Sequence, residues 1–215
     1  MKKAISLLIL LGLFISFAAN AQDAKAKSIL DKVSTKFKSA KTMKANFALT
    51  INGANGKTGT SRKGTFLMKG KRYKVDMGKQ QIICDGHTIW TYLVANKEVQ
   101  ISTFNPDEQT ISPAKLFSGS YETEYKYHYS GTQTIGGKKV AVIELKPSQS
   151  GKSFSRVLLY IDQAASMITG GQIFEKNGNA YTYKISNVKT NAPLSDSEFT
   201  FNTNQHPDVE VIDLR

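Results

Sequence analysis

Apolar residues in the segment Asp23–Lys41 recur with the period of an α-helix. Ile29, Leu30, Val33 and Phe37 fall at spacings that keep them on one helical face. Lysine fills much of the opposite face, and the aspartate that opens the segment can serve as an N-cap. The pattern therefore predicts one amphipathic helix that buries its apolar face.

From Met43 onward, apolar and polar residues alternate, which is the period of a half-buried β-strand. Phe47, Leu49 and Ile51 set the pattern, and short runs of it recur along the chain. Turn residues separate the runs, including Asp85-Gly86, which is a strong hairpin signal. In the second half, strands are predicted over Tyr121–Tyr129, Lys139–Lys146, Ser155–Asp162, Met167–Lys176, Ala180–Val188 and Glu198–Phe201, and Asp208–Leu214 can pair as a last strand.

The segment Pro106–Gly119 interrupts the alternation. Within it, Ser112–Phe117 predicts a short helix, because Ser112 suits the N-cap and Pro113 the first helical position. No linker or internal repeat divides the chain, so residues 22–215 are expected to form one domain. The expected fold is mainly β (α+β), with a single large curved antiparallel sheet of about eleven strands and helices on one face.

Residues 1–21 have the features of a secretory signal peptide. Lys2 and Lys3 give a positive start, Ile5–Phe17 is apolar, and Ala19-Asn20-Ala21 fits a cleavage site. The apolar run is shorter than the ~20 residues of a transmembrane helix. No cysteine follows it to carry a lipid anchor, so the mature protein is expected to be free in solution outside the cytoplasm, which the resemblance described below implies to be the periplasm.

The formal net charge is +12 at pH 7, and lysines are spread along the chain. Export argues against nucleic acid as a partner. Two interpretations of the basic surface remain, an ordinary solvated surface or attraction to acidic membrane or protein surfaces. The single cysteine, Cys84, excludes an internal disulfide, and its strand-like surroundings favour a small buried side chain over a nucleophile.

The sequence offers no motif for catalysis or metal binding. His87, His128 and His206 lack metal-ligand spacing, and no G-x-S-x-G motif marks a nucleophile. The segment Gly53–Thr58 lacks the full spacing of a phosphate-binding loop. We therefore expect a protein that is not an enzyme and that uses no metal or cofactor.

Aromatic residues are the most informative excess, since nine tyrosines and eleven phenylalanines fall largely on alternating positions. Much of this set can be explained as the core of a sheet beneath its helices. A sheet this long, however, presents a wide concave face that one long and one short helix cannot fully cover. A partly uncovered apolar concavity is the alternative, and it predicts a ligand site.

A series of motifs also runs through the whole mature chain. In order they are Gly64–Lys69, Tyr73, Ile82–Tyr92 with the core D-G-x-x-x-W-x-Y, Glu98–Ile101, Gly171–Ile173, Tyr183–Val188, Phe199-Thr200-Phe201 and Asp208–Ile212. Together these motifs resemble the periplasmic lipoprotein carrier family, LolA.

The resemblance implies an unclosed half-barrel of antiparallel strands with a helical lid. It also implies a monomeric carrier that shelters the acyl chains of lipoproteins in a hydrophobic cavity. The cargo would come from an inner-membrane ABC transporter and pass to an acceptor at the outer membrane. The alternative of another class is a sensor or structural module of the same fold, which binds envelope lipids or lipoproteins without moving them.

The expected lipid-binding residues are aromatic or flexible side chains on alternating positions, with two of them in the short helix as lid contacts. They are Phe47, Leu49, Phe66, Met68, Tyr73, Trp90, Leu116, Phe117, Tyr181 and Tyr183. Trp90 is equally well explained as a core anchor. Where the family has the Arg-Pro that holds its lid closed, this chain has Lys69-Gly70-Lys71-Arg72. Lys69 is therefore the candidate latch, without the planar fork of arginine.

Overall fold

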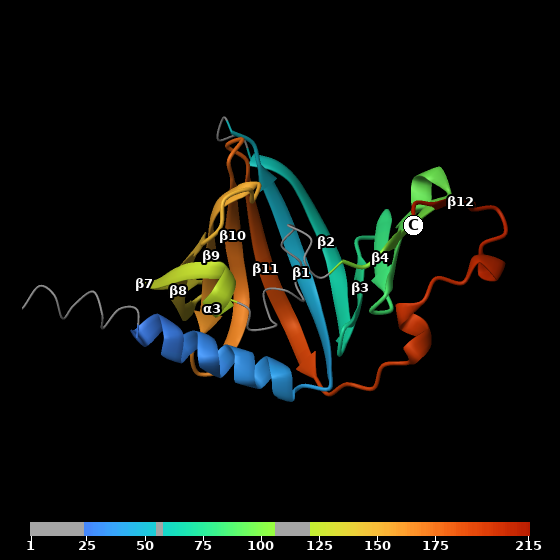
Figure 1. The fold of residues 1–215 in the computed structure, drawn as a ribbon. Coiled ribbons are helices and arrows are strands. Elements are labelled where there is room, and N and C mark those ends of the chain that lie inside the picture. Colours follow the sequence, from blue (N-terminus) through green and yellow to red (C-terminus); the bar gives the residue numbers. More distant parts are fainter. Residues whose placement is uncertain (1–23, 55–57, 106–120) are drawn as a thin grey trace, which may run out of the picture.

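In the computed structural model, which describes residues 24–54, 58–105 and 121–215, the strands form one continuous curved sheet (Figure 1). The sheet has twelve strands in the order β12-β6-β5-β4-β3-β2-β1-β11-β10-β9-β8-β7. The strands are β1 (Thr42–Asn52), β2 (Thr58–Lys69), β3 (Arg72–Asp76), β4 (Gln80–Cys84), β5 (Thr88–Leu93), β6 (Glu98–Thr103), β7 (Tyr125–Ile135), β8 (Lys138–Pro147), β9 (Phe154–Asp162), β10 (Met167–Glu175), β11 (Ala180–Thr190) and β12 (Glu210–Asp213). This architecture confirms the predicted unclosed half-barrel with a helix across it.

Tight turns make most neighbouring strands consecutive in the chain. At the turn from β4 to β5, a carboxylate oxygen of Asp85 accepts hydrogen bonds from the backbone N–H groups of His87 at 2.8 Å and Thr88 at 2.7 Å. Gly86 has a φ of +98°, a conformation that side chains other than glycine rarely adopt. The Asp85-Gly86 signal therefore produces the predicted hairpin.

The helix of residues 24–39 packs on the inner face of the sheet, over β7 to β10 (Figure 1). Ala26 and Leu30 are fully buried there. The hydroxyl of Tyr121 donates a 2.6 Å hydrogen bond to the Leu30 carbonyl, and the Lys25 ammonium lies 3.8 Å from the centre of the Tyr129 ring. Apolar burial and these two contacts fix the helix to one half of the sheet.

Two predicted strand boundaries were wrong. Residues Tyr121–Glu124 form the short helix α3, so the strand predicted over Tyr121–Tyr129 begins only at Tyr125. The predicted strand Glu198–Phe201 is replaced by a 3-10 helix, η2 (Asp196–Phe199), which the Ser195 side chain caps by accepting from the Ser197 N–H. The alternating phenylalanines Phe199 and Phe201 belong to a segment that packs against the sheet and forms no strand pairs.

The last strand, β12, pairs with β6 in parallel, which is the one departure from antiparallel order in the described sheet. After β11 the chain crosses the outer face of the sheet, and it then enters β12 in the same direction as β6. The short helix predicted over Ser112–Phe117 and the N-cap predicted at Asp23 lie outside the described residues.

Residues 191–209, here called the C-terminal segment, cross the outer face of the sheet near β3 and β4. Phe199 of this segment is fully buried, and the Arg72 guanidinium lies 5.6 Å from the centre of its ring. The Asp196 carboxylate accepts a 2.6 Å hydrogen bond from the Lys69 ammonium, and the Lys74 ammonium lies 3.3 Å from a Glu198 carboxylate oxygen. The segment is thus held by one aromatic anchor and a row of ion pairs.

Within the described part of the chain, no helix is both long enough and apolar enough to cross a membrane.

Truncation of Phe199 tests this role of the C-terminal segment. Phe199→Ala should lower the free energy of unfolding by about 3–5 kcal/mol, because it empties a fully buried aromatic site. The exposed neighbour Thr200→Ala serves as control and should change stability by less than about 0.5 kcal/mol. Urea unfolding of the three proteins measures both values. Equal stability of the two variants would contradict the anchoring role.

Candidate functional site

The inner face of the sheet carries two apolar cores with a gap between them. One core joins the helix of residues 24–39 to β7, β8 and β9. The other gathers around Met68, Tyr73 and Cys84 on β2, β3 and β4. Phe37 near the end of the helix touches both cores. The described helix sends no other residue across to the second core, so none of the described helices bridges the surface between the two cores.

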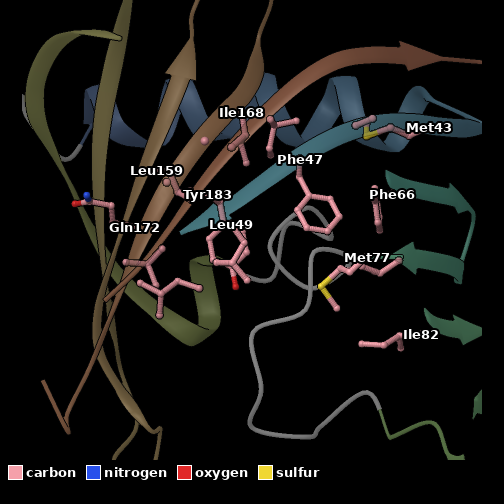
Figure 2. A pocket seen from close by; sticks show the side chains of 17 residues that line it. Met43, Phe47, Leu49, Phe66, Met77, Ile82, Leu159, Ile168, Gln172 and Tyr183 are labelled. Carbon is pink, nitrogen blue, oxygen red and sulfur yellow. The ribbon is translucent and has the colours of Figure 1, made fainter. Parts of the chain in front are cut away.

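A cavity of about 270 Å³ occupies this gap, and Figure 2 shows the side chains that surround it. Its walls come from β1 to β4 on one side and from β9 to β11 on the other. The lining residues are Met43, Ala45, Phe47, Leu49, Phe66, Val75, Met77, Ile82, Val157, Leu159, Ile168, Gly170, Gly171, Gln172, Ile173, Tyr183 and Ile185. The lining therefore brings together residues from both ends of the sequence.

Alternation along β1 supplies the floor of the cavity. Phe47 stands opposite Ile185 of β11, and Leu49 stands opposite Tyr183, so these pairs share the inner face. Phe47 also stands opposite Gly64 of β2. A Cβ atom added to Gly64 would lie 2.7 Å from the Phe47 ring, so the missing side chain is what gives this ring its place.

Polar groups are sparse in the cavity. Among the described lining side chains only Gln172 and Tyr183 are polar, and Gln172 turns away in Figure 2 and donates to the Thr182 hydroxyl at 3.3 Å. Burial raises the pKa of the Tyr183 hydroxyl, and Tyr181 and Glu175 raise it further. The hydroxyl is therefore neutral at physiological pH and can donate one hydrogen bond to a bound molecule.

This arrangement suits the binding of an apolar chain and offers little for catalysis. The walls provide flexible methionines, aromatic rings and aliphatic side chains, which adapt to a ligand of irregular shape. The described residues contain no group of three or more His, Cys, Asp or Glu side chains that could hold a metal ion. Cys84 is buried, and its burial raises the pKa of the thiol, which disfavours the reactive thiolate.

The structure brings together four of the residues expected to bind lipid. Phe47, Leu49, Phe66 and Tyr183 all line the cavity. Met68 and Tyr73 lie instead in the neighbouring core, where each is less than a tenth exposed. They face the same side of the sheet but are covered by their own neighbours.

The other expected residues lie elsewhere. Tyr181 is on the inner side next to the cavity but does not line it. Ile82 of β4 lines the cavity, so the next residue of that strand, Ile83, points to the outer face. Trp90 stands opposite Ile83 and Ile101 and therefore also lies on the outer face. Trp90 therefore belongs with the outer packing. Leu116 and Phe117 lie outside the described residues.

Lys69 contacts the C-terminal segment on the outer face. Its ammonium lies 2.6 Å from Asp196 and donates to the Leu194 carbonyl at 3.5 Å. Hydrogen bonding from Lys69 and the nearby charge of Arg72 hold the pKa of the Asp196 carboxyl below its usual range. In the described structure Lys69 thus fastens this segment, on the face away from the cavity.

The expected set of lipid-binding residues favours aromatic side chains, so it lacks most of the aliphatic residues and the glycines that line the cavity. Val75 and Met77 follow Tyr73 at every second position, and Ile82 lies two positions before Cys84. Their alternation was a usable signal. No local pattern could have singled out Gly170 and Gly171, of which Gly171 stands directly opposite Leu159 and Tyr183 and leaves room beside them.

Comparison with known proteins gives a family match over most of the chain. Residues 38–202 match the family model described as outer membrane lipoprotein carrier protein LolA. An outer-membrane lipoprotein carrier protein of Coxiella burnetii is 26% identical over 207 residues, which cover 93% of this chain and 94% of the relative.

Two further likenesses are to uncharacterized proteins. A protein of Methanocaldococcus jannaschii is 25% identical over 205 residues, and the aligned part spans 92% of this chain but only 56% of the relative's length. The crystal structure of an uncharacterized conserved protein from Thermus thermophilus superposes with a TM-score of 0.56 at 14% identity, covering 88% of this chain and 99% of that one. The latter supports the fold alone.

A side chain added at Gly64 tests the shape of the cavity. Gly64→Ala would place its Cβ against the Phe47 ring and the Asp76 carbonyl, so β2 or the ring has to shift. We expect a loss of about 1–3 kcal/mol in unfolding free energy and weaker binding of an apolar fluorescent dye. Gly53→Ala meets no atom within 4 Å and is the matched control. Unchanged stability and dye binding in Gly64→Ala would disprove the tight approach.

Proposed function

Because the chain belongs to the LolA family of outer membrane lipoprotein carrier proteins, we propose that it carries lipoproteins across the periplasm with their acyl chains in the described cavity. The observation that supports this role best is the apolar cavity between the two cores, with walls of methionine, aromatic and aliphatic side chains. The same cavity contains Phe47, Leu49, Phe66 and Tyr183.

The energetics of an acyl chain in water explain why such a cavity is needed. Each methylene removed from water contributes about 0.8 kcal/mol, so an acylated protein does not cross an aqueous compartment unshielded. The described lining of the cavity offers apolar burial and one neutral hydroxyl, that of Tyr183, and no charged side chain. Binding that relies mainly on non-directional contacts allows release to an acceptor with greater affinity.

The compartment and the partners belong to the same proposal. Residues 1–21 would direct export and be removed, and the mature protein would be unanchored, since Gln22 rather than a cysteine follows Ala21. A freely diffusing monomer can then accept cargo from an ABC-type transporter in the inner membrane and pass it to an acceptor at the outer membrane. No catalytic step and no cofactor enter this cycle.

A release assay with spheroplasts tests the carrier role. Spheroplasts that are synthesising a labelled lipoprotein are incubated with the purified protein, and lipoprotein in the supernatant is measured after sedimentation. We expect release into the supernatant as a soluble complex with the protein. If the protein binds acylated lipoprotein but releases none from the spheroplasts, the non-shuttling sensor or structural role replaces the carrier role.

Two adjacent residues of β1 provide a matched pair of variants for this assay. Leu49 lines the cavity, whereas Thr50 stands opposite Ser61 and Thr182 on the outer face. Leu49→Glu should lower release at least about tenfold, because a carboxylate in the cavity has to be desolvated when a chain binds. Thr50→Glu adds the same charge outside the cavity and should release lipoprotein like the wild type. Equal release by both variants would sink the assignment of the cavity.

A further inference from the structure

Four exposed lysines gather on the outer face of β2, β1 and β11. Lys44 of β1 stands directly opposite Lys189 of β11. Ala48 of β1 stands opposite both Lys63 of β2 and Lys184 of β11. Opposed residues share a face of the sheet, and Lys44 and Ala48 are four positions apart on one strand, so all four lysines lie on the same face. We call this set the lysine patch.

A β-bulge in β11 is what puts its two lysines on one face. Lys184 and Lys189 are five positions apart, and in a regular strand residues at this spacing point to opposite faces. The register between β1 and β11 shifts between Lys44 and Asn46, and Asn187 there has a φ of +52°. The extra residue restores Lys189 to the outer face beside Lys44.

The acidic side chains near the lysine patch are engaged elsewhere. Asp76, which stands opposite Thr65, accepts hydrogen bonds from the Gly78 N–H and the Gln81 amide. In the C-terminal segment, Asp196 is paired with Lys69 and Arg72, and Glu198 is paired with Lys74. Farther along the outer face, the carboxylate of Glu144 lies 2.8 Å from the Lys146 ammonium and 3.4 Å from Arg156. Within the described residues, none of the four ammonium groups of the patch has a salt bridge.

The positions between the lysines are small and uncharged. Asn46 stands opposite Thr65 and Ser186, and this neutral row separates the Lys44 pair from the Lys63 pair. Like charges placed directly opposite across two strands destabilise a sheet, as Lys44 and Lys189 do here. The fold thus keeps an unneutralised positive surface although an uncharged side chain at either position would relieve this repulsion.

The composition of the patch distinguishes between the two acidic partners that the charge admits. Specific protein interfaces rely on aromatic and arginine anchors and are depleted in lysine. The patch has lysine, serine, threonine, asparagine and alanine, without an aromatic ring or a guanidinium among these residues. Flexible point charges around small polar residues suit a surface whose phosphates move laterally.

We propose that the lysine patch binds the surface of an anionic phospholipid bilayer by electrostatic attraction. The attraction acts through headgroup phosphates and needs no inserted apolar side chain. Because Phe47 and Leu49 lie on the opposite face of β1, the cavity stays accessible while the outer face is docked. This inference goes beyond the carrier role and does not depend on it.

Cosedimentation with vesicles tests the proposal on a protein of residues 22–215. One set of vesicles mixes phosphatidylglycerol with phosphatidylcholine, and the other contains phosphatidylcholine alone. Binding is expected on the anionic vesicles only, and it should fall steeply as salt shortens the range of the attraction. The combined variant Lys44→Gln, Lys63→Gln, Lys184→Gln and Lys189→Gln should bind the anionic vesicles at least about tenfold more weakly.

A second combined variant controls for net charge. Lys79→Gln, Lys138→Gln, Lys139→Gln and Lys176→Gln remove the same charge from exposed positions in or beside turns, away from the patch. This control should bind the anionic vesicles like the wild type, and thermal unfolding should show both variants folded. Equal losses in the two variants, equal binding of the wild type to neutral vesicles, or no binding to anionic vesicles would each overturn the proposal.

Discussion

In the described structure, the helix of residues 24–39 covers only part of the inner face of the twelve-stranded sheet. The helix of residues 24–39 buries its apolar face against β7 to β10, where Leu30 loses all contact with water. In the other half of the sheet, inner side chains pack against one another in a second core around Cys84. The cavity is the part of the inner face between these cores. Its apolar lining follows from the same alternation that builds the cores.

The outer face of the same strands obeys a different constraint. On β2 to β6 both faces carry apolar residues, and on the outer side Val99 of β6 is fully buried. The C-terminal segment covers this second apolar surface, and Tyr92 packs there against Phe201 with ring centres 5.2 Å apart. The motif from Asp85 to Tyr92 therefore serves the hairpin and the outer packing. Residues that identify the family need not be the residues that line its cavity.

On the outer face of β3, β2, β1 and β11, positive charge is divided between two groups of bases. Beneath the C-terminal segment, Lys69, Arg72 and Lys74 meet carboxylates and help to hold the segment in place. On β2, β1 and β11, the lysine patch meets no carboxylate in a salt bridge within the described structure. Both groups of bases lie on neighbouring strands of one surface, and their roles differ only in what the chain lays over them. The formal net charge of +12 is thus neither evenly neutralised nor evenly free.

The sequence by itself determined the strands, the amphipathic helix and the open mainly β architecture, because period and turn chemistry are local properties. It also placed Phe47 and Leu49 on one face of their strand. Only the tertiary structure decided which inner residues line the cavity and which are sealed in a core, as Met68 is. It likewise decided that Trp90 faces outward, that Phe199 lies in a 3-10 helix and that a bulge unites the lysine patch. These outcomes depend on pairing register and on coverage by distant segments, which no local pattern encodes.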